Sequence, residues 1–369
     1  MSDRPALTNL AAGLPATVPF VGPEAQERQR GKSFRARIGA NESGFGPSPK
    51  VKQAIADAAG DVWQYADPEH HDLKTALSAH LGVAPGNIVI DGGIDNLLGL
   101  LVRLFVEQGQ PVVTSLGAYP TFNYHVAGFG GRLVTVPYVE DREDLEGLVA
   151  AVRRENAPLV YISNPDNPMG TWWEASELDL LINALPETTM LVLDEAYSET
   201  APASSVPLLD VSRPNVIRMR TFSKAYGLAG MRCGYAIGEA GVIGAFDKVR
   251  NHFGMNRLTL TAALAALSDQ DYLTQIVAQV ASSRKRIAAI ASENGLTALP
   301  SATNFVAIDC GKDGAFALKV MQELIARDVF VRKPMAPVLD RCIRVSVGPD
   351  EEIAVFEAEL PAALAAARG

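Results

Sequence analysis

The sequence predicts an α/β protein that has a large domain with a mostly parallel mixed sheet covered by helices, plus a smaller α+β domain. Short apolar runs alternate with longer helical patterns between residues 87 and 238, and several runs are apolar on both faces. Such runs are typical of a parallel sheet buried between two layers of helices. From about residue 257 a long helical pattern precedes a second, shorter set of strands and helices. A chain of 369 residues is long enough for two such domains.

The expected elements follow from these runs in chain order. The predicted strands of the large domain are 87–90, 111–115, 131–137, 158–163, 190–194, 216–220 and 234–238. The small domain is expected to contain strands at 304–310, 329–332 and 342–347 and helices over 314–327 and from about residue 350. The predicted organisation is an N-terminal arm (1–35), a large domain (36–256), a helical bridge (257–292) and a small domain (293–369), on which the arm is free to pack.

Charge and cysteine usage exclude several classes of protein. The net charge is −9, from 33 basic and 42 acidic residues, and the sequence contains no basic cluster suited to nucleic acid. Cys233, Cys310 and Cys342 lie far apart and outside CxxC pairs, so neither a disulfide framework nor a zinc site is predicted. The first residues do not predict a secretory leader, and no apolar run comes near the roughly 18 residues of a membrane span. We therefore expect a cytoplasmic protein without a metal, membrane or nucleic-acid partner.

Two neighbouring predicted strands end in groups that can act together. The run MLVLD ends in Asp194, and Tyr197 follows three residues later. The next run, VIRMR, leads to Ser223 and Lys224. Because the carboxyl ends of parallel strands meet at one edge of a sheet, we expect an acid and an amine to face each other there. Taken singly, each of these residues is more often structural than catalytic.

An amine in a dry pocket indicates a particular chemistry. Burial lowers the pKa of a lysine, and its neutral amine condenses with aldehydes. Pyridoxal phosphate is the cofactor that uses such a lysine, and its ring withdraws electrons when a carboxylate keeps the ring nitrogen protonated. Asp194 is the candidate carboxylate, and Tyr197 and Asn167 are candidate donors to the ring oxygen beside the aldehyde.

The rest of the cofactor requires an anion site and an aromatic surface. Ser223 and Arg232 flank Lys224 and suit a phosphate. Gly93 and Ile94 follow a predicted strand and open a helical pattern, where backbone N–H groups bind anions. Tyr119, in GAYPTF, suits the face of the ring, although it is also interpretable as a core tyrosine. The segment DGGIDNLLG lacks GxGxxG spacing, which disfavours a dinucleotide fold.

These motifs together resemble a known family. In the family's order the chain contains ANESGFGPSP, QYADPE, DGGIDNLL, GAYPTF, SNPDNPMG, LDEAYSE, TFSKAYGLAGMRCGY and RCIRVSVGPDEE. The sequence is thereby identified as a member of the fold type I (aspartate aminotransferase) superfamily of pyridoxal phosphate enzymes, and it is most similar to the histidinol-phosphate aminotransferase branch. The resemblance implies that Lys224 is the Schiff-base lysine and proton shuttle, with Asp194 at the ring nitrogen. It also implies the cofactor contacts expected above for Tyr197, Asn167, Tyr119, Ser223, Arg232, Gly93 and Ile94.

The resemblance also implies substrate and subunit contacts. Tyr65 matches the tyrosine that reaches the cofactor phosphate of the neighbouring subunit, which implies a homodimer with shared active sites. Arg344 matches the arginine that binds the substrate carboxylate or phosphate, and Arg332 matches one that contacts the substrate phosphate. Asn41 opens the segment at the substrate end of the site. Phe20 stands where family members usually carry a tyrosine whose hydroxyl binds that phosphate.

The expected function is ping-pong transamination between an amine, with histidinol phosphate as the first candidate, and a 2-oxo acid such as 2-oxoglutarate. Aromatic or other hydrophobic amino acids are alternative substrates. Decarboxylation of a phosphorylated amino acid is an alternative reaction, because the cofactor residues would be the same. A catalytically silent sensor domain is a third alternative, although the arm is too short for the DNA-binding domain that such proteins carry.

Overall fold

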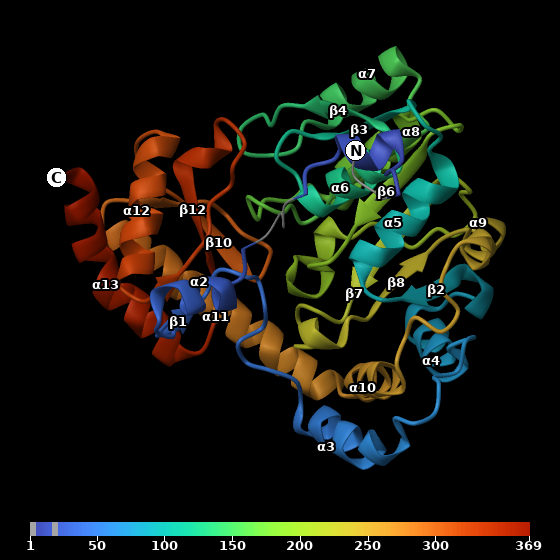
Figure 1. Cartoon of the computed structure of the whole chain (residues 1–369), viewed down its shortest axis with the longest axis horizontal. Coiled ribbons are helices and arrows are strands. Elements are labelled where there is room, and N and C mark those ends of the chain that lie inside the picture. Colours follow the sequence, from blue (N-terminus) through green and yellow to red (C-terminus); the bar gives the residue numbers. More distant parts are fainter. Residues whose placement is uncertain (1–4, 17–20) are drawn as a thin grey trace.

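Two groups of β-strands, connected by the long helix α11 (Gln270–Glu293), form the frame of the molecule (Figure 1). The computed structural model describes residues 5–16 and 21–369. Phe20, predicted to lie at the substrate, is outside the described residues.

The larger group is a seven-stranded sheet in the order β2-β8-β7-β6-β5-β3-β4. Its strands are β2 (Ile88–Asp91), β3 (Pro111–Ser115), β4 (Arg132–Val136), β5 (Leu159–Ser163), β6 (Met190–Asp194), β7 (Val216–Thr221) and β8 (Gly234–Ile237). Strand β8 runs antiparallel to both of its neighbours, and every other neighbouring pair is parallel. The predicted mostly parallel mixed sheet is therefore confirmed.

Helices cover both faces of this sheet, as the continuous apolar strands predict. On one face, α5 (Ile94–Phe105) and α6 (Pro120–Gly128) pack against side chains such as Tyr161 and Val192. The other face is covered by α4 (His71–Leu81), α7 (Leu145–Glu155), α8 (Ala175–Ala184) and α10 (Arg257–Ser268). Each large apolar side chain that is fully buried stabilises the fold by about 1.5–3 kcal/mol relative to an exposed one. Helix α3 (Pro49–Ala58) packs on α10, and α9 (Ala240–Ala245) follows β8.

The smaller group of strands forms the C-terminal part. Strands β9 (Thr297–Ala298), β10 (Phe305–Asp309) and β12 (Cys342–Ser346) make an antiparallel sheet, while β1 (Ala36–Arg37) pairs in parallel with β11 (Val329–Phe330). Helices α12 (Gly314–Ala326), α13 (Asp350–Arg368) and α11 complete its core. Ala36 and Ile38 also lie in this core, although the predicted boundary assigned them to the large domain. The division into four regions stays a prediction.

The described part of the N-terminal arm contains α1 (Asn9–Gly13) and α2 (Pro23–Arg30). Residues after α2 pack on the C-terminal part (Figure 1). Lys32 and Arg30 form ion pairs with Asp328, and the rings of Phe34 and Phe330 lie 5.3 Å apart. The first strand and the end of the arm are therefore held on the C-terminal sheet.

The structure also bears on disulfides, membrane spans and metal sites. Cys233, Cys310 and Cys342 are buried free thiols. Among the residues that the structure describes, none of the helices is both apolar enough and long enough to cross a bilayer. No group of three or more potential metal ligands gathers within that same part of the chain.

Candidate active site

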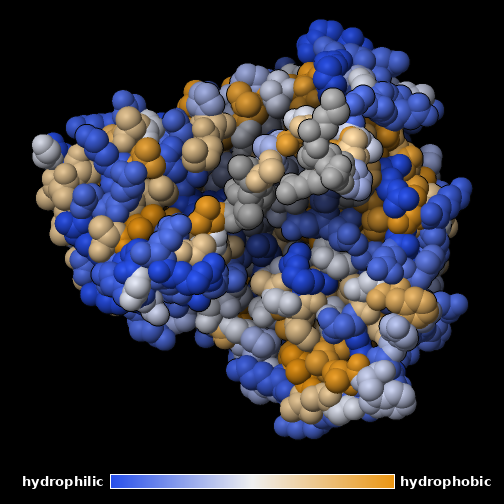
Figure 2. Space-filling view, viewed as in Figure 1, coloured by the Kyte–Doolittle hydropathy of each residue, from blue (hydrophilic) through white to orange (hydrophobic). Residues whose placement is uncertain are grey.

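The site is built where β5, β6 and β7 end. The parallel register pairs Ser163 with Asp194 and Asp194 with Met219, so the polar residues at the strand ends lie side by side. A cavity of about 330 Å³ opens there, in the hollow between the two parts of the molecule (Figure 2). Of the residues predicted for the site, this cavity is lined by Ile94, Tyr119, Asn167, Asp194, Tyr197, Ser223, Lys224 and Arg232.

Lys224 lines the cavity, and its amine lies near a backbone carbonyl and an aromatic ring. Its Nζ donates to the carbonyl oxygen of Asn41 at 3.2 Å and lies 5.6 Å from the ring centre of Tyr197. Burial, together with the positive charge of Arg344, lowers the pKa of Lys224 to about 8. A substantial fraction of its amine is therefore neutral and nucleophilic near neutral pH.

Asp194 is a buried carboxylate at the end of β6. Its Oδ1 accepts from the backbone N–H of Ala196 at 2.9 Å, and its Oδ2 accepts from the hydroxyl of Tyr161 at 2.7 Å. Burial raises the pKa of Asp194 to about 6, and these two bonds oppose that rise. A cation beside this carboxylate would stabilise its charged form further.

Tyr197 and Asn167 are held so that each keeps a donor for a ligand. The Tyr197 hydroxyl accepts from the side-chain amide of Asn41 at 3.2 Å, which leaves its own proton to donate. The Oδ1 of Asn167 accepts from Arg344 at 2.6 Å, which leaves the NH2 group of Asn167 to donate. Asn41 also exchanges hydrogen bonds with Ser346 and has a left-handed backbone, with φ of 57°.

A second end of the cavity is suited to an anion. Gly93 precedes α5 with φ of 90°, and a Cβ there would lie 2.5 Å from Nη2 of Arg232. Glycine is therefore required for the guanidinium to approach the start of the helix. Arg232, itself at φ of 53°, donates to the hydroxyl of Ser223 at 3.3 Å. Cation, hydroxyl and helix N–H groups converge as a phosphate requires.

Asp95 connects this anion site with the aromatic residue above the cavity. Its carboxylate accepts from the hydroxyl of Tyr119 at 2.7 Å and lies 3.6 Å from Arg232. Asp95 therefore holds the ring of Tyr119 and the guanidinium of Arg232 in fixed relation to each other.

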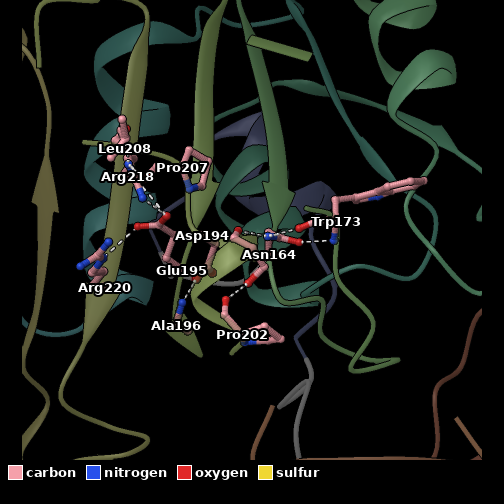
Figure 3. A network of polar contacts seen from close by, with 11 residues as sticks. Asn164, Trp173, Asp194, Glu195, Ala196, Pro202, Pro207, Leu208, Arg218 and Arg220 are labelled. Carbon is pink, nitrogen blue, oxygen red and sulfur yellow. Dashed lines mark hydrogen bonds and ion pairs between the residues drawn. The ribbon is translucent and has the colours of Figure 1, made fainter. Parts of the chain in front are cut away.

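Behind Asp194, a buried ion pair joins β6 to β7 (Figure 3). Glu195 accepts from Nε of Arg218 at 3.0 Å and from Nε of Arg220 at 2.9 Å. Arg218 also donates to the carbonyl oxygens of Pro207 and Leu208. Removal of one partner from such a buried pair typically costs about 3–5 kcal/mol, so this network secures the strands that carry Asp194 and Lys224.

Two arginines border a second cavity of about 590 Å³ that shares Tyr119 and Asn167 with the first. Arg332 and Arg344 are neighbours through a backbone bridge, in which Arg344 N donates to Arg332 O at 2.6 Å. Burial, together with the charge of Arg332, lowers the pKa of Arg344 to about 10. The Nε of Arg344 is buried without a partner among the described residues. The two guanidinium groups give this cavity a positive rim that suits an anionic ligand.

Comparison with known proteins agrees with this geometry. Residues 37–358 match the family described as aminotransferase class I and II. The chain belongs to this family. Family membership confirms the predicted aminotransferase activity, the pyridoxal phosphate cofactor and the fold class.

Individual relatives of this aminotransferase indicate the branch of the family to which it is most similar. Histidinol-phosphate aminotransferase 1 of Nitrosococcus oceani is 36% identical over 352 residues, which cover 94% of each chain. Histidinol-phosphate aminotransferase 2 of Carboxydothermus hydrogenoformans is 36% identical over 97% of this chain and 98% of its own. The crystal structure of the Sinorhizobium meliloti histidinol-phosphate aminotransferase with pyridoxal-5'-phosphate is 60% identical over 97% of both chains, with a TM-score of 0.95. The predicted branch of the superfamily is thereby confirmed.

The aminotransferase structure does not bring every predicted residue into the cavity. Tyr65 is 79% exposed and packs on Phe253, with ring centres 5.1 Å apart, beside a different cavity. Within one chain it is therefore separate from Lys224, as a residue serving another subunit would be. Its predicted contact across subunits stays a prediction.

Three residues that surround the cavity are not predicted from the sequence. Tyr161 and Asp95 contact Asp194 and Arg232 respectively, and Asn304 donates to the carbonyl oxygen of Asn41 at 3.0 Å. Asp95 and Tyr161 lie within patterns that predict an anion site and a core strand, and neither pattern indicates which groups their side chains contact. Asn304 lies about 260 positions from its partner, and no local pattern signals that contact.

The lowered pKa of Lys224 predicts its labelling behaviour. In the cofactor-free aminotransferase, acetylation by trace acetic anhydride should rise with pH to a midpoint near 8, because the neutral amine reacts. Ordinary lysines reach half reaction near about pH 10.4. Mass spectrometry of the peptide that contains Lys224 would measure this midpoint. A midpoint at the ordinary value would contradict the described environment of Lys224.

Proposed function

We propose that this aminotransferase acts on histidinol phosphate, with a 2-oxo acid such as 2-oxoglutarate as the acceptor of the amino group. The adjacent Arg332 and Arg344 at the rim of the shared cavity carry this proposal. A guanidinium fork binds a phosphate or a carboxylate through two oxygens at once. The pair therefore suits the phosphate of the amine and the carboxylates of the oxo acid in turn. The three relatives named above support the same substrate.

The residues of the main cavity fit pyridoxal phosphate from one end to the other. Gly93, Ile94, Ser223 and Arg232 would hold its phosphate, and Tyr119 would lie on its ring. In the same arrangement, the ring nitrogen would meet the carboxylate of Asp194, while the ring oxygen would accept from Tyr197 and Asn167. When bound, the cofactor supplies an electron-withdrawing ring that stabilises negative charge at the carbon bearing the amine.

Lys224 would carry the proton during the reaction. Its Nζ, with a pKa of about 8, is basic enough to take a proton from the carbon that bears the substrate's amine and acidic enough to return it. Arg344 would orient the substrate from the opposite side, and Asn41 would position both Lys224 and Tyr197. A positioned base of this kind contributes about 10²- to 10⁴-fold to the rate.

A substrate panel tests the proposal. With 2-oxoglutarate as acceptor, histidinol phosphate should yield glutamate with kcat/KM at least about 10-fold above that of histidinol, because a charge-assisted contact contributes about 1.5–3 kcal/mol. Coupled glutamate detection would measure both rates. Higher kcat/KM for phenylalanine or leucine would favour the hydrophobic substrates instead. Carbon dioxide release from phosphothreonine without glutamate would favour the decarboxylase.

Lys224→Ala is the control for this panel. Its turnover should fall by at least about 10²-fold, because the positioned base is lost. The variant should still bind the cofactor, although without the covalent link that borohydride traps in the wild-type protein. A catalytically silent sensor domain would show the covalent link in the wild-type protein, but neither protein would turn over substrate.

Arg332→Gln tests the phosphate contact alone. KM for histidinol phosphate should rise by about 10- to 100-fold, with little change for phosphate-free histidinol, because one charge-assisted contact is lost. Steady-state kinetics on both amines would measure this difference. Arg327→Gln is the matched control, because Arg327 pairs with Glu323 on α12 and lines neither cavity. Equal losses on both amines would contradict the assignment of Arg332.

We also propose that the chain forms a homodimer in the cytoplasm. Val62, Trp63, Tyr65 and Phe253, which we call the apolar patch, are 57–80% exposed. Figure 2 shows apolar side chains gathered over the α3 and α10 end of the molecule. Along the chain, Val62, Trp63 and Tyr65 follow α3, and Phe253 precedes α10. Exposed apolar groups of this size favour a protein partner, and a second copy would bring Tyr65 to the opposite site. The three buried free thiols are consistent with a reducing compartment.

Trp63→Glu should convert the dimer to a monomer, because a buried unpaired carboxylate is unfavourable at an interface. Sedimentation velocity would measure the oligomeric state. Leu208→Glu is the control, since Leu208 is 94% exposed and lies outside the apolar patch. Tyr65→Phe should keep the dimer and weaken cofactor affinity about 10-fold, through loss of one hydrogen bond to a charged phosphate. A monomeric wild-type protein with full activity would contradict the shared site.

A further inference from the structure

The carboxylate of Asp194 is held by donors on both of its oxygens, and one of them is a side chain with no role assigned so far. The hydroxyl of Tyr161 donates to Oδ2 at 2.7 Å, while the backbone of Ala196 binds Oδ1. Tyr161 is fully buried and Asp194 is 5% exposed. A buried carboxylate favours its neutral form unless donors stabilise the charge, so these contacts decide its protonation.

The position of Tyr161 is fixed by the sheet and by α6. Tyr161 lies two residues before Ser163 on β5, so both side chains point to the same face as Asp194. Its ring stacks on Phe122 with 4.6 Å between centres and 18° between planes. Burial also raises the pKa of Tyr161 far above its usual value, so its hydroxyl stays neutral and can serve as a donor.

Some of the groups around Asp194 raise its pKa, and others lower it. Burial raises its pKa most, and Asp95 on α5 raises it further. The bond from Tyr161 is the strongest influence that lowers it, ahead of the Ala196 N–H and the charge of Lys224. Tyr197, in the loop after β6, is a neutral neighbour whose own pKa is raised by burial. Loss of the Tyr161 hydroxyl would therefore leave the carboxylate with its weaker supports only.

We propose that Tyr161 is a positioning residue for transamination, which keeps Asp194 anionic and aimed at the cofactor's ring nitrogen so that the proton stays on that nitrogen. The inference rests on the proposed placement of Asp194 beside the ring nitrogen. The bond from a phenol is stronger to a carboxylate than to a carboxylic acid. Without it, the shared proton moves from the nitrogen toward Asp194, and the ring withdraws electrons less well.

The direct test is the protonation of the ring nitrogen in the holoenzyme. Tyr161→Phe keeps the ring and its stacking on Phe122 but removes the hydroxyl. With ¹⁵N-labelled pyridoxal phosphate bound, the nitrogen chemical shift reports the balance between charged and neutral ring across pH. We expect this balance to move about 10-fold toward the neutral ring in Tyr161→Phe, because a bond to a charged group shifts an equilibrium by at least that factor.

Tyr138→Phe is the matched control. The hydroxyl of Tyr138 also donates at 2.7 Å to a buried carboxylate, but its acceptor is Asp166 rather than Asp194. The ring nitrogen signal should therefore be unchanged in Tyr138→Phe, although both variants lose a buried hydrogen bond. Equal shifts in the two variants, or none in Tyr161→Phe, would overturn the proposal. Incorporation of 3-fluorotyrosine at position 161 supplies a stronger donor and should shift the balance the opposite way.

A titration of the cofactor-free protein separates this inference from the proposed function. The ¹³C signal of the Asp194 carboxyl, assigned with Asp194→Asn, should report a pKa about one pH unit higher in Tyr161→Phe than in wild type. An unchanged pKa would overturn the role of Tyr161 whatever the substrate. A raised pKa with an unmoved ring nitrogen would instead overturn the placement of Asp194 beside the ring, and the inference with it.

Discussion

The site depends on the register of the central parallel strands. Backbone hydrogen bonding pairs Ser163 on β5 with Asp194 on β6 and leads β7 to Thr221, three residues before Lys224. A slip by one residue in one of these strands would turn its side chains to the opposite face of the sheet, and in β6 this would remove Asp194 from the cavity. The buried pair between Glu195 and the arginines of β7 resists such a slip, because each misplaced charge would lose its partner.

Structural and functional charges in this region differ in how completely they are paired. Both oxygens of Glu195 accept from guanidinium groups, and burial does not prevent its pKa from lying below the usual range. Its neighbour Asp194 has no cationic hydrogen-bond partner among the described residues, and its pKa is raised to about 6. The pKa values of these two adjacent carboxyl groups are therefore shifted in opposite directions. The incompletely compensated group is the one that lines the cavity, as expected where a ligand supplies the missing charge.

The sequence was sufficient to predict the strands of the large sheet and the polar residues at their ends, because both depend on local patterns of residues. Apolar runs located all seven strands of the sheet, and the chemistry of acid, amine and hydroxyl groups located the cavity. The direction of β8, the pairing of β1 with β11 and the contact of Asn304 with Asn41 required the structure, since each joins distant segments. Tyr161 was missed for another reason. A tyrosine in a strand that is buried on both faces is predicted to be a core residue. Only the hydrogen-bond partner of its hydroxyl, seen in the structure, indicates a role at the site.

The positive charges of the site also affect one another. Arg344 is among the groups that lower the pKa of Lys224, and Arg332 in turn lowers the pKa of Arg344. An anion held between the two arginines offsets this repulsion, so the pKa of Lys224 rises toward its ordinary value once the anion is bound. If the two arginines bind the anionic substrate, as proposed, Lys224 is a stronger base in the presence of the substrate than in its absence. The proposed substrate contacts would thereby link binding to the basicity of Lys224.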